Sequence, residues 1–409
     1  MQSLKIRFRL HDLLFYLLLV VSFYYTRNML CRVMMVVFFG YTVLQTIVKK
    51  RKVPMPFFYF GFLAFILYGA VNMLLGNVID GGIARTMIVS LTLNFLMIVA
   101  IAQYIYASNN IPRVLRVAEC GILSTAVVVV VLSLGTITQG RLGGGTEMNA
   151  NMLALLSAYG LVISMYLKKI QQINRLAFWL RAVFYVLVIL LTGSRKGLLV
   201  VALSVVIVRL VTERKKIIRN LFLIAGMLVL IYFLIMNVSV LYNVIGSRVE
   251  SLLSFLSEGE TTEASLSDRH SLTHIGMSYV KDKPWTGYGY DCFKLVSGMG
   301  PNGRVPIGKV GFYSHNNYVE LLFGGGIIGL VLFYIPVVYL LRQILKGLRA
   351  DTCAPYLLAI LLSKLAMEYA YVSYYERVDA YIMAVLLGCA LVACKRQVNG
   401  DQKQLQQSI

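Results

Sequence analysis

The chain has 409 residues, of which 58% are hydrophobic and 14% are charged, and its formal net charge is +21. Apolar runs of about 20 residues, the length that crosses a bilayer core of roughly 30 Å, recur along the whole sequence. Runs such as 127–132 are apolar on every side, which excludes a transmembrane β-barrel with its alternating segments. The composition therefore predicts an all-α, polytopic membrane protein.

Transmembrane helices are predicted from one end of the chain to the other. The first apolar run starts at Leu13 and has no small-residue cleavage pattern after it, so we expect a retained helix rather than a signal peptide. About twelve helices are expected, near 12–25, 29–48, 56–75, 83–106, 117–138, 149–167, 176–192, 196–211, 220–236, 317–341, 355–375 and 378–394. Residues 1–394 would form a single membrane domain, followed by a polar, disordered tail at 395–409.

Basic residues are unevenly distributed among the predicted connections. Lys and Arg gather in the N-terminal segment, in connections such as 49–52, 168–175 and 209–219, and in the tail, whereas connections such as 76–82 carry few charges. Because short loops rich in Lys and Arg stay in the cytoplasm, both termini are expected to be cytoplasmic. The long loop of about 237–316 is then extracytoplasmic. The basic charge indicates contact with anionic inner-leaflet lipid, and no nucleic-acid partner is expected.

Within this loop, the segment 265–279 is predicted to form a short amphipathic helix on the membrane face. Arg269 would lie in its first turn, near the positive end of the helix dipole, where an anion is favoured. The alternative is an ion pair between Arg269 and Asp268 or a neighbouring glutamate. His270 and His274 have the i, i+4 spacing of two metal ligands, but no carboxylate or cysteine stands at ligand spacing beside them, so no metal is expected.

The segment 192–197 is a predicted turn between two apolar helices at the outer surface. Backbone amides at the start of the second helix form an anion site, and the planar guanidinium of Arg195 matches phosphate oxygens. The alternative is a tight turn whose Arg195 and Lys196 side chains extend to lipid headgroups. Both interpretations fit the spacing of these residues.

A third candidate segment, 314–318, directly precedes the helix predicted from residue 317. A neutral imidazole with a partner on one ring nitrogen is well suited to deprotonate a hydroxyl near neutral pH. His315 is therefore a candidate general base. The alternative is that His315 caps the following helix alongside Asn316.

Several short motifs follow one another in a fixed order. They are the segments 143–154, 192–197, 268–269, 284–289 and 314–316, and the glycines at 324–326. In this order, over about residues 140–341, the sequence resembles the O-antigen ligase and Wzy polymerase superfamily. It departs from the family pattern at Lys196, where a small residue is commoner.

The resemblance implies a membrane-embedded, GT-C-like glycosyltransferase that is independent of metals, requires no cofactor and uses a polyprenyl-pyrophosphate-linked sugar as its donor. Arg195 and Arg269 would hold the donor pyrophosphate and stabilise charge on the departing diphosphate. His315 would accept the proton of the acceptor hydroxyl, with inversion at the anomeric carbon. The expected accessory residues are Arg304, Asn316 and Tyr318.

The function expected from the resemblance is polymerisation of lipid-linked repeat units into O-antigen, capsule or exopolysaccharide, on the outer face of a bacterial cytoplasmic membrane. The acceptor would be a second lipid-linked glycan, and a flippase and a chain-length regulator are expected as partners. A close alternative is a ligase that moves finished glycan onto lipid or protein. A second alternative is a multi-pass transporter, which would place ionisable residues near the bilayer midplane. The candidates for such residues are Arg85, Arg181, Lys364 and Glu368.

Overall fold

The computed structural model describes residues 9–24, 28–135, 141–143, 148–213, 264–300, 303–348 and 351–407, together with isolated positions between 219 and 250. The side chains of 264–266 and 398–407 are not described. Almost all ordered structure in the described ranges is helical, with one two-stranded antiparallel hairpin. This confirms the predicted all-α class.

The helices follow in chain order, and the figures use the same labels. They are α1 (Leu10–Tyr24), α2 (Met29–Val48), α3 (Phe57–Leu74), α4 (Gly81–Ser108), α5 (Ile111–Ser133), α6 (Ala150–Lys169), α7 (Arg175–Leu191), α8 (Arg195–Thr212), α12 (Ala264–Asp282), α13 (Asn317–Gly347), α14 (Ala354–Met367) and α15 (Arg377–Gln407). Between α12 and α13 lie a 3₁₀ turn, Cys292–Leu295, and the hairpin of β1 (Met299–Gly300) and β2 (Gly303–Arg304).

Seven of these helices are long and apolar enough to cross a membrane: α2, α3, α4, α5, α6, α13 and Arg377–Gln397 of α15. The polytopic character of the chain is therefore confirmed. The helix predicted near 220–236 lies largely outside the described residues. The other predicted helices all have counterparts, and the short helix expected at 265–279 is confirmed as α12.

Three helix boundaries differ from the prediction. α5 begins at Ile111 rather than 117, because the Asn110 side chain accepts a hydrogen bond from the Arg113 amide and Pro112 suits a first helical turn. α14 ends at Met367 rather than 375. α15 continues through Gln407, so the disordered tail expected at 395–409 is wrong for most of its length. Its Gln and Lys residues favour a helix, and the segment extends a helix already nucleated by the span, through Asn399, Gly400 and Asp401, which have low helix propensity.

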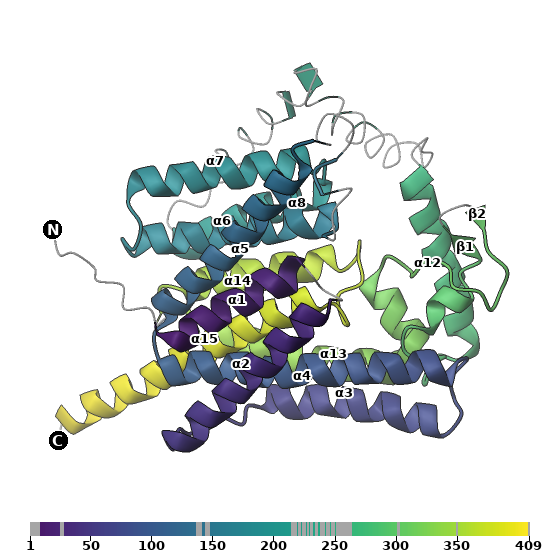
Figure 1. Ribbon diagram of the computed structural model, residues 1–409, viewed down its shortest axis with the longest axis horizontal. Helices are drawn as coiled ribbons and strands as arrows, with labels where there is room; N and C mark the ends of the chain where they lie inside the picture. Colours follow the sequence, from purple (N-terminus) through teal and green to yellow (C-terminus); the bar gives the residue numbers. More distant parts are fainter. Residues whose placement is uncertain are drawn as a thin grey trace.

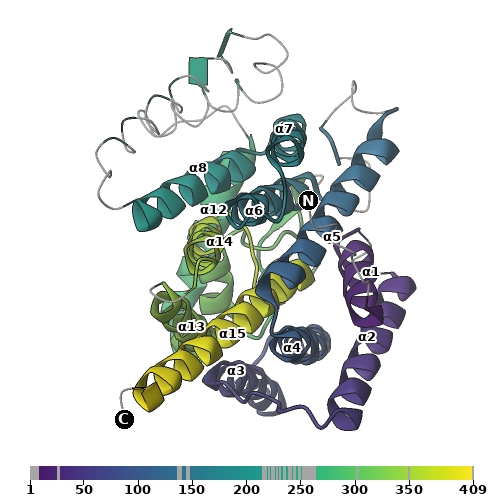
Figure 2. The same ribbon diagram turned by 90° about the vertical axis from the view of Figure 1, so that its left-hand side faces the viewer.

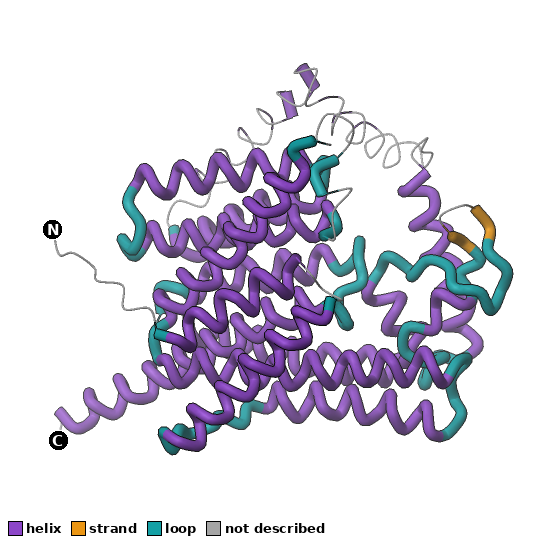
Figure 3. The backbone as a smooth tube through the Cα atoms, in the orientation of Figure 1, coloured by secondary structure: helices purple, strands orange, loops and turns teal. Residues whose placement is uncertain are grey.

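In Figure 1, α3, α4, α6 and α7 run roughly parallel, α2 and α5 are tilted against them, and α12 runs steeply on the right. Figure 2 looks from the left-hand end of that view and shows α3, α4, α6 and α14 nearly end-on. α15 packs along α4, where a methyl group on Gly388 would come within 2.7 Å of Ile105 Cβ. Figure 3 shows the loops and the hairpin of the α12–α13 region gathered on the right, opposite the end of α15.

The break in α13 joins this loop region to the bundle. Gly326 has a φ of 63° and interrupts the helix. Here the Tyr288 amide donates to the Phe323 carbonyl at 2.8 Å, and the Ile327 amide donates to the Pro284 carbonyl at 2.8 Å. A Cβ on Gly326 would lie 2.2 Å from Trp285 backbone atoms. The motifs 284–289 and 324–326 therefore interlock backbone to backbone, which only glycine permits.

A charge cluster is buried where α14, α15 and their connecting loop meet. The Lys364 ammonium lies 2.5 Å from a Glu368 carboxylate oxygen and 3.4 Å from one of Asp379. It also donates to the Ser373 hydroxyl at 3.2 Å, and the Tyr371 hydroxyl donates to Asp379 at 2.8 Å. One cation thus contacts two carboxylates in an apolar interior.

Removal of Lys364 is expected to destabilise the protein strongly. Lys364→Met would leave two buried carboxylates without their cation, at a cost of about 3–5 kcal/mol. Thermal unfolding in detergent micelles measures this, with Lys281→Met on the exposed face of α12 as control. Adding Glu368→Gln and Asp379→Asn should restore part of the loss. A Lys364→Met protein as stable as the wild type would contradict the role of the cluster.

The sidedness inferred from the basic residues makes a second prediction. Lys309, after the hairpin, and Lys52, in the α2–α3 connection, are both exposed. If the long loop is extracytoplasmic, an impermeant maleimide should label Lys309→Cys in intact spheroplasts and Lys52→Cys only after permeabilisation. The unsubstituted protein, whose Cys292 is buried, is the control. The opposite pattern of labelling would reverse the orientation.

Candidate active site

A cavity of about 450 Å³ lies where the α12–α13 region meets the starts of α6 and α8 and the α14–α15 loop. Its apolar lining comes chiefly from α1, α6 and the start of α15. The residues that line it are Phe23, Met148, Asn149, Asn151, Met152, Leu155, Lys196, Arg269, Tyr313, His315, Tyr371, Val372, Glu376 and Val378. Cationic, polar and apolar side chains therefore face the same space.

The turn before α8 is shaped by two glycines. Gly193 has a φ of 59° and its amide donates to the Leu190 carbonyl at 2.9 Å, which ends α7. A Cβ on Gly197 would lie 2.8 Å from the Ala154 methyl, so this glycine lets α8 approach α6 closely. The 192–197 motif thus sets the position from which Arg195 and Lys196 start α8.

Arg141 braces the same turn from the α5–α6 connection. Its Nε donates to the Thr192 carbonyl at 2.7 Å, and its Nη2 donates to the Asn151 side-chain oxygen at 3.2 Å. The Ser194 hydroxyl lies 3.0 Å from the same Asn151 oxygen. The sequence does not single out Arg141, because its partners are a backbone carbonyl and a side-chain amide, which no sequence motif marks.

His315 is held by the residues on either side of it. The Asn316 side chain caps α13 by accepting from the amides of Tyr318 and Val319 at 3.0 and 3.3 Å. The buried Glu320 accepts from the Ser314 amide at 2.8 Å. His315 itself has a φ of 57° and leaves the capping to Asn316. The alternative in which His315 caps the helix is therefore wrong.

Asn317 ties the start of α13 to the α14–α15 loop. Its side-chain oxygen accepts hydrogen bonds from the backbone amides of Ser373 and Tyr374 at 2.8 and 3.0 Å. Its backbone amide donates to the Glu368 carbonyl at 2.8 Å. These bonds explain why α14 stops before residue 375. Backbone groups of the loop form hydrogen bonds with Asn317 instead of the hydrogen bonds of a further helical turn. Tyr371 and Glu376 reach the cavity from this loop.

The imidazole of His315 is kept neutral by its surroundings. Its ring packs against Tyr313 with centroids 4.1 Å apart and makes no hydrogen bond to the described residues. Burial, and after it the positive charges of Arg269 and Lys196, together lower the pKa of His315 from 6.5 to about 4. At neutral pH the ring therefore offers an unprotonated nitrogen to the cavity.

Lys196 is the cation that the structure adds to the predicted set. Only 8% of it is exposed, its Nζ donates to the Ala370 carbonyl at 2.6 Å, and it lies 5.4 Å from the centre of the Tyr371 ring. Burial, and after it the positive charges of Arg269, Arg141 and Arg195, lower the pKa of Lys196 to about 7, so an anion in the cavity would favour its charged form. The sequence marked Lys196 only by its departure from the family pattern. The alternative interpretation of the turn explained this lysine as a contact to lipid headgroups.

Of the three residues expected in the active site, Arg269 and His315 lie together at the cavity. Arg269 comes from α12, which packs on α13 so closely that a Cβ on Gly276 would meet Val319 at 2.4 Å. Arg195 occupies the first position of α8 but does not line the cavity, where its neighbour Lys196 does.

The three expected accessory residues lie outside the cavity. Arg304 is exposed on the hairpin, and Asn316 is buried as the cap of α13. The Tyr318 hydroxyl donates to the Leu365 carbonyl at 2.9 Å, away from the cavity. His270 and His274 are exposed on α12, and the described residues contain no cluster of three or more possible metal ligands.

A known protein family matches the part of the chain that contains Lys196, Arg269 and His315 of the candidate active site. Residues 177–334 match the family model Wzy_C, described as O-antigen ligase. The match contains α7, α8, α12 and most of α13, and with them Arg195, Arg269 and His315. No curated protein matches the chain. The resemblance stated from the motifs is therefore confirmed.

The charges around His315 make a prediction that does not depend on any reaction. Diethyl pyrocarbonate modifies neutral imidazoles, so the modification of His315, followed by peptide mass spectrometry against pH, should show a midpoint of about 4. Lys196→Gln should move the midpoint upward toward 6.5, because it removes a charge that disfavours the imidazolium. Lys281→Gln on exposed α12 should leave it in place. A wild-type midpoint near 6.5 would contradict this description of the site.

Proposed function

We propose, for a chain whose residues 177–334 place it in the O-antigen ligase and Wzy superfamily, that it polymerises polyprenyl-pyrophosphate-linked oligosaccharide units into a cell-surface polysaccharide. The family supports a membrane glycosyltransferase-type enzyme. Polymerase activity, an extracytoplasmic site, and a flippase and chain-length regulator as partners are parts of the proposal. The observation that carries it is the neutral imidazole of His315 in one cavity with the Lys196 and Arg269 cations.

The donor diphosphate would lie against the cations. Lys196 and Arg269 provide positive charge from two different helices, and Arg195 adds to it at the positive end of α8. The arginine fork matches phosphate oxygens, whereas the lysine acts as a point charge. The apolar lining, with Phe23, Met152 and Leu155 among its residues, suits the first part of a polyprenyl chain.

The transfer step then needs one base. The acceptor hydroxyl oxygen attacks the anomeric carbon, the bond from that carbon to the diphosphate oxygen breaks, and the hydroxyl proton passes to His315. Polyprenyl diphosphate leaves with the electron pair, and the cations stabilise its charge. His315 afterwards releases its proton to water. Attack opposite the leaving group inverts the anomeric configuration.

Binding of the donor would also tune the base. Burial holds the pKa of His315 at about 4, and the charges of Arg269 and Lys196 contribute to the same shift. A dianionic diphosphate between them and the ring would offset their charge and raise the pKa of His315 toward the neutral range, where a general base is most effective. The imidazole would thus become a stronger base once the donor is in place.

A ligase of the same superfamily remains the alternative, since the matching family carries that description. The two activities differ in acceptor, not in the groups described above. The transporter alternative gains no support: Lys364 and Glu368 are paired with each other, and the Arg181 guanidinium lies 3.3 Å from Glu119. These charges are paired within the bundle rather than arranged along a path.

The test of the proposal is turnover by purified variants with lipid-linked repeat units. His315→Ala should lower the rate by about 10²- to 10⁴-fold, the contribution of a positioned base, while it leaves donor binding in place. Arg269→Gln should weaken donor binding. Excess EDTA should not inhibit. A ladder of products from the repeat unit alone indicates a polymerase, and products only with added lipid or protein acceptor indicate a ligase.

His270→Ala is the matched control, because His270 lies on the exposed side of α12 and outside the cavity. Its rate should stay close to that of the wild type. Near-normal turnover by a well-expressed His315→Ala protein would eliminate the base. Full activity of Arg195→Ala would remove Arg195 from the proposed mechanism and leave Lys196 and Arg269 as its cations.

A further inference from the structure

A second hollow, of about 890 Å³, lies at the other ends of the helices that form the candidate active site. α6 carries Asn151 at the first cavity and Lys168 at the second, and α8 carries Lys196 at the first and Arg209 at the second. At 1.5 Å per residue these separations are about 25 Å and about 20 Å, most of the roughly 30 Å thickness of a bilayer core. The two cavities therefore lie near opposite faces of the membrane.

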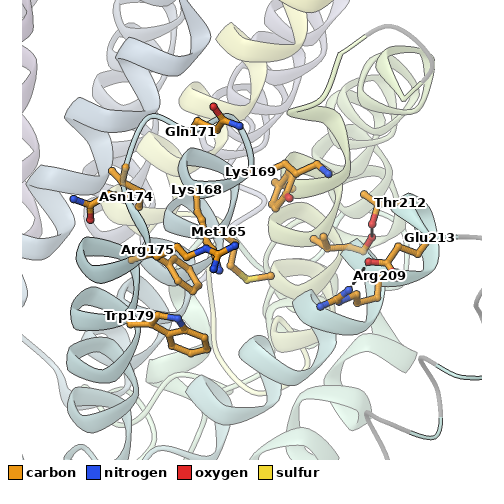
Figure 4. A pocket seen from close by; sticks show the side chains of 14 residues that line it. Met165, Lys168, Lys169, Gln171, Asn174, Arg175, Trp179, Arg209, Thr212 and Glu213 are labelled. Atoms are coloured by element: carbon orange, nitrogen blue, oxygen red, sulfur yellow. Dashed lines mark hydrogen bonds and ion pairs between the residues drawn. The ribbon is translucent and has the colours of Figure 1, made fainter. Parts of the chain in front are cut away.

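We call the second hollow the basic pocket and define it by Lys168, Lys169, Arg175, Trp179, Arg209 and Glu213. Figure 4 shows these side chains coming from the end of α6, the start of α7 and the end of α8 around one space. Glu213 forms ion pairs with Arg209 and Arg219. Among the described residues, neither Lys169 nor Arg175 pairs with a carboxylate. The pocket thus has a net positive charge.

The wall of the pocket combines a lysine with aromatic side chains, as is typical of the interface between water and lipid. The Lys168 ammonium lies 4.3 Å from the Phe178 ring centre and 5.3 Å from that of Trp179, so its charge is held over aromatic faces. Trp179 is 59% exposed. Tryptophan concentrates at the membrane interface, where its ring is apolar and its N–H meets polar groups.

An exposed apolar surface continues from the pocket along α7. Leu176, Leu180, Val183 and Leu187 on this helix are each more than half exposed. In a helix bundle that crosses a membrane, such a row of side chains faces acyl chains. The α6–α7 turn at the mouth of the pocket is fixed, because Arg116 donates to both oxygens of Gln172 at 2.6 Å.

We propose that the basic pocket binds the phosphate headgroup of an anionic membrane lipid whose acyl chains lie along the exposed face of α7. The charges select the class of lipid. A zwitterionic headgroup brings its own cation, which Lys169 and Arg175 would repel, whereas an anionic headgroup supplies only the negative charge that the pocket lacks. This site is separate from the candidate active site and independent of its reaction.

Fluorescence of Trp179 provides a direct test, because the chain has only 2 tryptophans. Trp285→Phe, a change at an exposed position beside Gly326, leaves Trp179 as the single emitter. This protein is reconstituted in phosphatidylcholine vesicles that contain a small, equal fraction of either brominated phosphatidylglycerol or brominated phosphatidylcholine. Bromine quenches tryptophan only at close range, so the phosphatidylglycerol should quench more strongly.

Two pairs of charge removals locate the effect. Lys169→Gln with Arg175→Gln should raise the brominated phosphatidylglycerol fraction needed for half-quenching on the order of tenfold. Lys168 is kept, so that the surroundings of Trp179 do not change. Lys49→Gln with Lys52→Gln removes the same charge from the exposed α2–α3 connection and should have no effect. Equal quenching by both lipids, a preference that survives the pocket substitutions, or equal loss in the control would overturn the proposal.

Discussion

The arrangement of the candidate active site depends on the buried pairing of Lys364 with Glu368 and Asp379. The two carboxylates stand at the two ends of the loop between α14 and α15, so a single ammonium fixes both ends. Breaking such a pair in an apolar interior costs far more than its formation contributes, which makes the geometry hard to relax. The middle of the loop is then free to serve the cavity, to which it brings Tyr371 and Glu376.

Asn317 extends this constraint to the candidate base. Its side chain and amide bond to three groups of the fixed loop, and it is the first residue of α13. Asn316 and Glu320 hold the turn just before it. His315 is therefore positioned through backbone and amide hydrogen bonds, while its own ring stays available to the cavity. A base placed in this way has a ring nitrogen that can bind a substrate, because the nitrogen is not needed for a hydrogen bond that stabilises the fold.

Sequence alone could predict the bundle, because long apolar runs and their flanking polar residues define helices locally. It could not predict where α14 ends, because the competing partner of residues 368–374 is Asn317, distant in the chain. The motifs 284–289 and 324–326 were recognisable as a family pattern, but their physical reason, two backbones in direct contact, requires both segments at once.

In the candidate site, too, the sequence does not reveal which single residues face the cavity, because this depends on contacts between distant segments. Arg269 and His315 line one cavity, although Arg269 is the sixth residue of α12 and does not lie in its first turn as expected. Lys196 was not identified as a cavity residue, because adjacent residues on a helix point about 100° apart and a sequence does not say which of Arg195 and Lys196 faces inward. The close contact of Gly197 with Ala154 fixes that rotation.

The two cavities at opposite ends of α6 and α8 explain why so polar a site can exist in so apolar a chain. Under the proposed function, the diphosphate of a polyprenyl donor would stay at the depth of the headgroups, and Lys196 and Arg269 would be useful only if they are held at that same depth. A helix pair of nearly bilayer length cannot shift one end without moving the other. Cations and Trp179 at the basic pocket resist such a shift, because it would draw charge into hydrocarbon. The position of the site across the membrane is then set by charge at both ends of two rigid helices.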